Sequence, residues 1–351
     1  HTVTVTEVGR VFTFGFGAYG QLGLGDRNDR DAPVEVEPAR FGGVRIAYAA
    51  AGCLHSGVVT SDGRVYTWGW ANLGQLGHND EQDELVPREL VGQFGGSVVV
   101  MLAAGREHTV FLMTDGAVWA CGSGHYGQLG LGDTAGRLVP ARVGAEEAFG
   151  QSKVLTIACG DDHSMAVTEE GGLWSWGCGY DGQLGHNDQG DRLVPTRVAT
   201  ERFGGAKVVT AGGGCAHSAA VTADGAVYTW GRAVIGLDPA GLGHDDLLDK
   251  LVPTLVEPRH LLGARVGRCL PLSPLHALAL AMGTHGRLGA GGAVPAAVGG
   301  GGWRKSRRVE GKEPVEEEGK GSAVMALAGE AGLVQMVAAL CGDWPEGAAG
   351  E

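Results

Sequence analysis

The stretch FGFGAYGQLGLGD, residues 14–26, begins with a segment, residues 15–20, that fits the G-x-G-x-x-G pattern of a dinucleotide-binding loop. Such a loop needs a helix directly after the glycines, because the N-terminus of that helix holds the pyrophosphate. Here the chain continues as QLGLGDRNDRDAP, which is turn chemistry that ends in a proline. The pattern therefore predicts a structural turn and no cofactor.

The same stretch returns along the chain as an internal repeat. It reappears as GWANLGQLGHND, GSGHYGQLGLGD and GCGYDGQLGHND, and more loosely as GLGHDD and GTHGRLGAGG. Its leading glycines are 54, 53, 55 and 54 residues apart, at Gly15, Gly69, Gly122, Gly177 and Gly231. A histidine stands 14 residues before each glycine, at His1, His55, His108, His163 and His217. A proline recurs after each, at Pro33, Pro87, Pro140, Pro195 and Pro253. Landmarks that keep their register over five periods indicate a repeat architecture.

Each period is predicted to contain four strands. In the second period these are VRIAYAAAG (44–52), HSGVVT (55–60), RVYTWG (64–69) after a D-G turn, and the segment around LVPREL (85–90). Proline cannot donate a hydrogen bond to a neighbouring strand, so its fixed place predicts that the fourth strand is the outer edge of each sheet. Four-stranded units that repeat without helices are typical of β-propeller blades.

These landmarks closely resemble the repeat of the regulator of chromosome condensation family: a G-x-x-H-[ST] element, a D-G turn, a Y-x-W-G strand, a G-Q-L-G-x-G-D loop and a late proline. The match covers about residues 1–260. The resemblance implies an all-β fold, a seven-bladed β-propeller of four-stranded antiparallel blades. In this chain the last two blades, around His276 and Leu333, are degenerate, and the first is truncated because the chain begins at its second strand. A six-bladed or open ring is the alternative.

Three regions are expected along the chain. Residues 1–300 are predicted to form propeller repeats of about 54 residues. Residues 301–321 carry a basic and then an acidic run and are predicted to be a disordered linker or loop. Residues 322–351 are predicted to hold the degenerate strands of the last blade and a C-terminal tail. Two possibilities stay open: the segment SAVMALAG, residues 322–329, completes the N-terminal blade, or the ring is open.

The repeated histidines and aromatic residues are predicted to be structural. Metal ligands and catalytic groups must converge on one point, whereas equivalent positions of successive blades are spread around a ring. We expect the histidines to be buried and hydrogen-bonded and the tryptophans to pack between blades. This structural set comprises His55, His108, His163, His217, Trp68, Trp176, Trp230, Gly69, Gly122, Gly177 and Gly231. We expect no catalytic, cofactor-binding or metal-binding residues and predict that the chain is not an enzyme.

Composition excludes some classes of binding partner. With 27 basic and 40 acidic residues the formal net charge is −13, which repels nucleic-acid phosphates, so no direct binding of nucleic acid is expected. Seven cysteines form no C-x-x-C pair and leave an odd one over, which favours an intracellular chain, in cytoplasm or nucleus. No apolar run approaches the ~20 residues of a membrane span. We expect a monomeric propeller or the propeller part of a larger chain.

Topology predicts one candidate partner-binding face. In an antiparallel four-stranded blade, the turn between strands one and two and the loop between strands three and four emerge on one side, and the D-G hairpins emerge on the other. The first side carries charged residues at positions that the scaffold does not fix. These residues are Asp26, Arg27, Asp80, Arg106, Glu107, Asp133, Asp161, Asp162, Asp188, Asp245 and Asp246.

Two classes of function stay open. The repeat scaffold, and the lack of residues that converge on a catalytic site, favour a protein-interaction scaffold that binds a protein partner through one face. The resemblance implies an alternative, a guanine-nucleotide exchange factor for a Ran-type small GTPase, and a further alternative, the propeller portion of a larger ubiquitin ligase. The acidic balance, and the lack of an inserted hairpin in the first five periods, speak against exchange activity.

Overall fold

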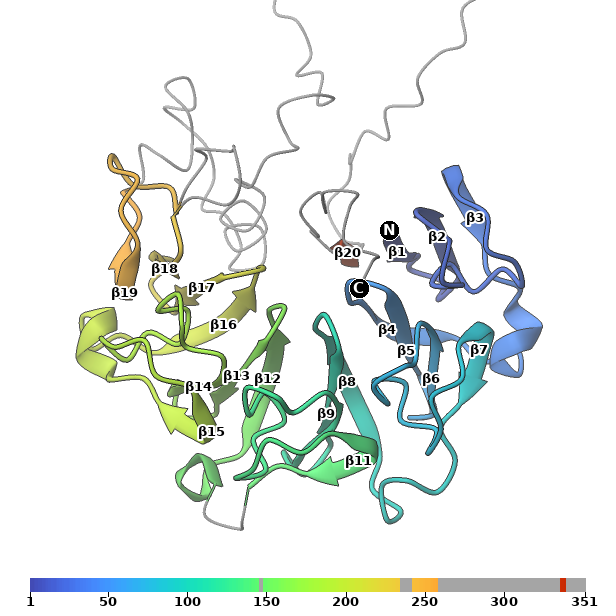
Figure 1. Cartoon of the computed structure of the whole chain (residues 1–351), viewed down its shortest axis with the longest axis horizontal. Helices are drawn as coiled ribbons and strands as arrows, with labels where there is room; N and C mark the ends of the chain where they lie inside the picture. Colours follow the sequence, from blue (N-terminus) through green and yellow to red (C-terminus); the bar gives the residue numbers. More distant parts are fainter. Residues whose placement is uncertain (145–147, 234–241, 258–334, 339–351) are drawn as a thin grey trace, which may run out of the picture.

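The computed structural model describes residues 1–144, 148–233, 242–257 and 335–338, and these residues form five four-stranded antiparallel sheets. The sheets stand side by side around an arc, with the first strand of each nearest the centre and the fourth at the rim (Figure 1). The fold is therefore an all-β propeller, and each sheet is one blade. The predicted sixth blade and the linker at 301–321 lie outside the described residues, and of the predicted last-blade region, 322–351, only residues 335–338 are described.

Blades 2 to 5 follow one another along the chain. Blade 2 comprises β4 (Ile46–Ala51), β5 (His55–Thr60), β6 (Val65–Gly69) and β7 (Glu84–Glu89). Blade 3 comprises β8 (Val99–Ala104), β9 (His108–Met113), β10 (Val118–Gly122) and β11 (Arg137–Arg142). Blade 4 comprises β12 (Val154–Cys159), β13 (His163–Thr168), β14 (Leu173–Gly177) and β15 (Arg192–Arg197). Blade 5 comprises β16 (Val208–Gly213), β17 (His217–Thr222), β18 (Val227–Gly231) and β19 (Lys250–Leu255).

Blade 1 is built from both parts of the chain. It comprises β1 (Thr2–Val5), β2 (Val11–Gly15), β3 (Arg30–Glu35) and β20 (Gln335–Ala338). Strand β20 pairs with β1 in antiparallel register, with Val3 opposite Val337. The chain thus enters blade 1 at its second strand, and a segment more than 300 residues later supplies the first. The segment at 322–329, which the sequence offers for this role, lies outside the described residues.

The four strands predicted for each period are confirmed, and so is the place of the proline strands. Strands β3, β7, β11, β15 and β19, each with its repeated proline, are the outer edges of their sheets. No helix follows the glycines at residues 15–20; tight turns lead instead to β3. The helical elements among the described residues are three single turns of 3-10 helix, which connect blades: η1 (Pro38–Phe41), η2 (Ala148–Gln151) and η3 (Thr200–Phe203).

The hydrophobic core lies between the blades. One cluster joins Val3 of blade 1 to Ile46 and Trp68 of blade 2, and comparable clusters fill each of the next three blade boundaries. The 3-10 turns add an aromatic side chain to this packing: the ring of Phe41 lies 6.2 Å from that of Trp68. Packing of this kind stabilises a blade only when its neighbour is present, so the repeats fold as an array.

A buried hydrogen-bond relay also crosses each boundary, and the one between blades 3 and 4 shows its parts. Ser164 Oγ of blade 4 donates to the carbonyl oxygen of Gln128 in blade 3 at 2.8 Å. Trp176 Nε1 of blade 4 donates to the same carbonyl at 2.9 Å. His108 Nε2 of blade 3 lies 2.9 Å from Ser164 Oγ. Because the single hydroxyl hydrogen goes to the carbonyl, His108 must donate through Nε2.

The relay repeats at the other boundaries. The histidine–hydroxyl pairs are His1 with Ser56, His55 with Thr109, and His163 with Ser218, at 2.8–2.9 Å. The corresponding carbonyls are those of Gln21, Gln75 and Gln183. Trp68 and Trp230 donate to two of these carbonyls, and Cys121 takes the tryptophan's place at the third. Burial lowers the pKa of His55 and His163 to about 4 and that of His108 to about 3, which keeps these rings neutral.

The leading glycine of each period lies where a side chain would collide with backbone. Gly122 has φ +107°, and a Cβ there would lie 2.3 Å from the carbonyl oxygen of Glu107 and 2.7 Å from His108 Cα. The other leading glycines have φ values between +97° and +105°. These positions require glycine both for the dihedral angle and for the close approach of two strands.

We expect Gly122→Val to lower the free energy of unfolding by more than about 3 kcal/mol, because strain at positive φ adds to a backbone collision. The matched control is Gly225→Val: Gly225 has φ +85° but no atom within 4 Å of the added Cβ. It should lose only the strain, about 1–3 kcal/mol. Urea unfolding measures both variants, and equal losses would contradict the collision argument.

Acid should destabilise the propeller through the relay histidines. Above pH 6.5 neither state binds a proton at these rings; below it the unfolded chain does, while the folded chain does so only near pH 3 to 4. The free energy of unfolding therefore falls as pH drops from 6.5 towards 4, with uptake of up to about three protons. We expect the His108→Gln variant to take up about one proton fewer than the unaltered protein when it unfolds in urea between pH 6.5 and 4. The same pH dependence in both proteins would contradict the assignment.

Candidate functional site

The turns between first and second strands and the loops between third and fourth strands meet on one side of the propeller. Trp70 N donates to the carbonyl oxygen of Leu54 at 2.9 Å, which ties the β6–β7 loop to the β4–β5 turn. Equivalent bonds join loop and turn in blades 3, 4 and 5. We call this surface the loop face. It consists of the turns at 52–54, 105–107, 160–162 and 214–216 and the loops at 16–29, 70–83, 123–136, 178–191 and 232–249, as far as these are described.

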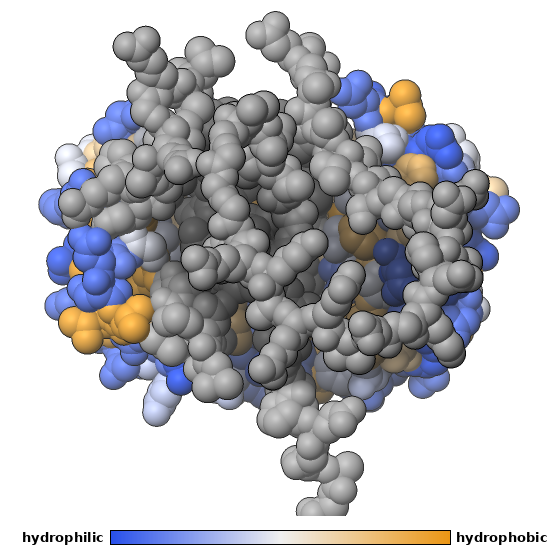
Figure 2. All heavy atoms as spheres, turned by 90° about the horizontal axis from the view of Figure 1, so that it is seen from above, coloured by the Kyte–Doolittle hydropathy of each residue, from blue (hydrophilic) through white to orange (hydrophobic). Residues whose placement is uncertain are grey.

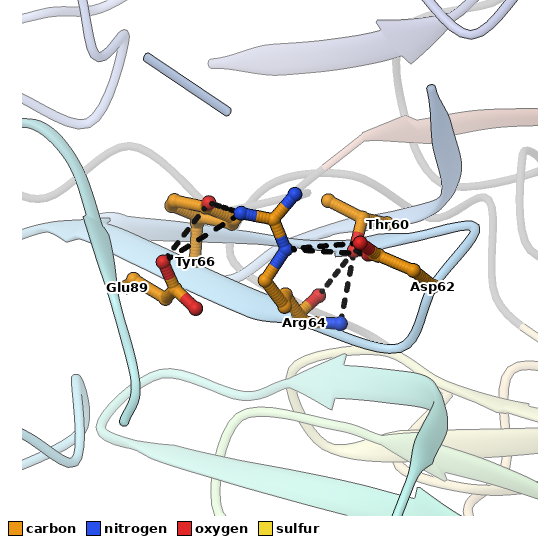
Figure 3. Close-up of polar contacts among 5 residues, drawn as sticks. All are labelled: Thr60, Asp62, Arg64, Tyr66 and Glu89. Carbon is orange, nitrogen blue, oxygen red and sulfur yellow. Dashed lines mark hydrogen bonds and ion pairs between the residues drawn. The ribbon is translucent and has the colours of Figure 1, made fainter. Parts of the chain in front are cut away.

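The opposite side carries the hairpins, whose polar groups are used locally. In the β5–β6 hairpin, Asp62 turns towards Thr60 and Arg64, and the Arg64 guanidinium also reaches the hydroxyl of Tyr66 at 3.1 Å (Figure 3). That hydroxyl donates to Glu89 Oε2 at 3.2 Å. The acidic residue of this D-G turn thus stabilises its own hairpin.

Five of the candidate aspartates anchor their own loops. In blade 4, Asp188 Oδ1 accepts the backbone N–H of Gly190 at 3.0 Å, and Asp188 Oδ2 pairs with Arg192 at 2.6 Å. Hydrogen bonds and the pairing with Arg192 hold the pKa of this carboxyl below its usual value. Asp26, Asp80, Asp133 and Asp246 make the same two kinds of contact in the other blades.

Two further candidates lie apart from these anchors. Arg27 of blade 1 donates to Asp83 of blade 2 at 3.0 Å and so links two adjacent loops. Asp245 is exposed in the β18–β19 loop of blade 5. The candidates on the long loops are therefore distributed one or two to a blade, and the structure does not bring them together at one point.

The turns at the centre do bring charged candidates together. Cys53 N donates to the Gly105 carbonyl at 3.2 Å, Arg106 N donates to that of Asp161 at 3.0 Å, and the turns thus contact one another around the centre. The Arg106 guanidinium donates to Asp162 Oδ2 at 2.9 Å. Burial raises the pKa of the Asp162 carboxyl to about 6, and the carboxylates of Asp161 and Glu107 add to the rise while Arg106 opposes it. This cluster brings four charged side chains of the loop face together.

Aromatic side chains on the loop face were not predicted from the sequence. Phe16 is 46% exposed, Tyr19 37%, Tyr126 42% and Tyr180 74%. The rings of Phe16 and Tyr19 meet edge to face at 6.1 Å, and Tyr19 meets Trp70 of the next blade at 6.3 Å. Hydrophobic patches lie among hydrophilic ones on the surface of the described residues (Figure 2). These four residues and Trp70 all occupy variable positions between repeated glycines. That placement is the signal by which the sequence could have identified them.

The loop face is also hollowed. A cavity of about 430 Å³ lies between the loops of blades 3 and 4, lined by Tyr126, Asp162, Cys178, Tyr180, Asp181 and Asp191. Within the described ranges, no group of three or more histidine, cysteine, aspartate or glutamate side chains is placed to hold a metal ion. The same residues include five cysteines, all free thiols, and no helix long and apolar enough to cross a membrane.

Comparison with solved structures supports this architecture. The structure superposes on Prp20p of Saccharomyces cerevisiae with a TM-score of 0.60 at 26% sequence identity, over 73% of this chain and 63% of that one. That structure is described together with the binding properties of Prp20p to Gsp1p and histones.

Sequence comparison gives closer relatives. The chain is 38% identical over 257 residues to the ultraviolet-B receptor UVR8 of Arabidopsis thaliana, which covers 73% of this chain and 56% of UVR8. It is 36% identical over 233 residues to the human E3 ubiquitin-protein ligase HERC2, which covers 66% of this chain and 5% of HERC2. The chain thus spans about half the length of UVR8 and a small part of HERC2. The model of the RCC1-like domain matches residues 1–270. On this match, and on its repeats and blades, the chain belongs to the family of RCC1-like domains.

Proposed function

We propose that this protein is a binding scaffold that engages a protein partner through the loop face. The observation that carries the proposal is the set of exposed aromatic rings, Phe16, Tyr19, Tyr126 and Tyr180, on loops that the backbone holds in place. Exposed aromatic residues beside paired charges are the composition of protein interfaces, in which tyrosine, tryptophan and arginine contribute most of the binding energy.

The charge distribution supports a protein partner. The net charge of −13 opposes binding to nucleic-acid phosphates. The ion pairs on the loop face are partly exposed, as for Asp133 and Arg137 with 48% and 30% of their side-chain surface accessible. Such pairs contribute only about 0–1 kcal/mol each, so a partner can replace them with its own charges at little cost. Prp20p, which has the same fold, binds proteins.

We expect the double variant Phe16→Ser/Tyr19→Ser to lose partner capture at least about tenfold, because two aromatic contacts are removed. The measurement is quantitative affinity capture with the intact chain from a lysate of the source organism, with the melting temperature of each variant as the folding check. Val8→Ser is the matched control, since Val8 is 70% exposed in the β1–β2 hairpin on the opposite side. A partner that the control loses and the double variant keeps would refute the use of the loop face.

A second candidate function is guanine-nucleotide exchange on a Ran-type small GTPase. The specific observation in its favour is the similarity to Prp20p, whose structure is described with its binding to Gsp1p. The similarity to HERC2 in turn supports the hypothesis that the chain is the propeller part of a larger ubiquitin ligase. That hypothesis agrees with the first proposal, because a propeller in such a chain would supply binding.

If the protein is an exchange factor, release of fluorescent GDP from the GTPase should be at least about tenfold faster at substoichiometric concentrations of the intact chain. The expected result for Phe16→Ser/Tyr19→Ser is loss of this acceleration, and for Val8→Ser retention of it. A panel of small GTPases that includes Ran provides the test. If folded chain accelerates release from none of them, the exchange hypothesis is wrong and the scaffold proposal stands.

A further inference from the structure

The cavity between blades 3 and 4 combines aromatic walls with carboxylates. Tyr126 comes from the β10–β11 loop, Tyr180, Asp181 and Asp191 come from the β14–β15 loop, and Asp162 comes from the β12–β13 turn. Its volume of about 430 Å³ lies within the range of specific ligand sites in proteins. Three separate segments therefore converge on one hollow of the loop face.

The carboxylates of the cavity are only partly satisfied by the protein. Asp162 uses Oδ2 for Arg106, and its Oδ1 is buried without a hydrogen-bond partner. A buried acceptor without a partner is costly, and more so when it belongs to a charged group, so a donor from outside would remove that cost. The Asp181 carboxylate has only a loose contact of 3.7 Å with the exposed guanidinium of Arg232.

Charge and shape together select the kind of donor. The three carboxylates of Asp162, Asp181 and Asp191 are accompanied by two guanidinium groups, those of Arg106 and Arg232, so negative charge is in excess. The rings of Tyr126 and Tyr180 are 42% and 74% exposed, which leaves aromatic faces for a cation to stack on. A guanidinium group suits both features, because it is planar, stacks on aromatic rings and donates two parallel hydrogen bonds to a carboxylate.

We propose that this cavity binds an arginine side chain of the partner protein. The inference rests on the proposed function, since it assigns to the loop face a subsite for a basic segment. Arginine inserted between Tyr126 and Tyr180 donates to Asp162 Oδ1 and neutralises the excess charge. The aromatic contacts of Phe16 and Tyr19 in blade 1 then act on another part of the same partner.

The test uses the intact chain with 3-fluorotyrosine in place of its six tyrosines, followed by ¹⁹F NMR. The probe is the peptide acetyl-Gly-Gly-Arg-Gly-Gly-amide. We expect saturable shifts at the resonances of Tyr126 and Tyr180, with the other four tyrosines unmoved. The peptide with citrulline, which has the same shape without charge, should bind at least about tenfold more weakly, and the lysine peptide several-fold more weakly.

Two variants locate the site. Asp162→Asn should weaken the arginine peptide about tenfold, and Tyr180→Ser, which changes a largely exposed side chain and leaves the fold intact, should weaken it several-fold. Glu201→Gln is the control, an equal change of charge at an exposed position in η3. The inference is overturned if the two tyrosines do not shift, if citrulline or lysine binds as well as arginine, or if the control weakens binding as much as Asp162→Asn.

The outcomes separate this inference from the proposed function. A partner that is captured through Phe16 and Tyr19, together with an arginine peptide that does not bind, overturns the arginine site and leaves the scaffold proposal intact. Conversely, the arginine peptide can bind as expected while the loop-face variants leave partner capture unchanged. That result supports the arginine site and overturns the scaffold proposal.

Discussion

In each of blades 1 to 4, a single backbone carbonyl oxygen holds the next blade in place. The backbone oxygen of Gln128 accepts one hydrogen bond from the hydroxyl of Ser164 and another from the indole of Trp176, and both donors belong to the following blade. His108 donates to the oxygen of the same hydroxyl, so the hydroxyl's own hydrogen stays directed at the carbonyl. Buried polar groups need partners, and this arrangement gives each group its partner only when two blades are correctly placed. Hydrophobic contact brings neighbouring blades together, and the relay fixes the angle between them.

The same constraint explains why the glycine loops are nearly invariant in shape. Thr67 donates to the carbonyl of Leu76 at 2.8 Å, next to the Gln75 carbonyl that blade 3 requires, and so fixes the loop within its own blade. Asp83 then holds the beginning of this loop through the Ala71 N–H. The positions between these bonds project from the loop face and are available for binding.

Much of the fold could be predicted from the sequence because its landmarks are local. The histidine, the D-G turn, the leading glycine and the proline each occupy a fixed place in one blade, so their spacing gave the strands and the outer edge of every sheet. Pairing of β20 with β1 depends on residues more than 300 positions apart, and a four-residue strand carries too little pattern to reveal its partner. The segment offered for this role, 322–329, lies outside the described residues, and the described strand that pairs with β1 is 335–338.

The loop face was harder to predict than the fold, for a physical reason. Charge at a variable position indicates binding only where the side chain is free to meet a partner, yet the Asp188 carboxylate is used by Gly190 and Arg192 within its own loop. A carboxylate is equally suited to stabilising a turn and to contacting a partner, and the sequence around it does not distinguish these two uses. An exposed aromatic ring such as Tyr180 has no such structural use on a loop.

The equivalent positions at the centre of the propeller illustrate how the scaffold separates stability from specificity. Cys53, Arg106 and Asp161 follow the same repeated glycine in successive blades, and each donates its backbone N–H to a carbonyl of the next turn. These bonds between successive turns are made by the backbone and do not depend on the side chain. A thiol, a cation and an anion can therefore stand in three equivalent places without loss of the fold. Repetition fixes the backbone of the loop face, and the differences between repeats give that face its chemistry.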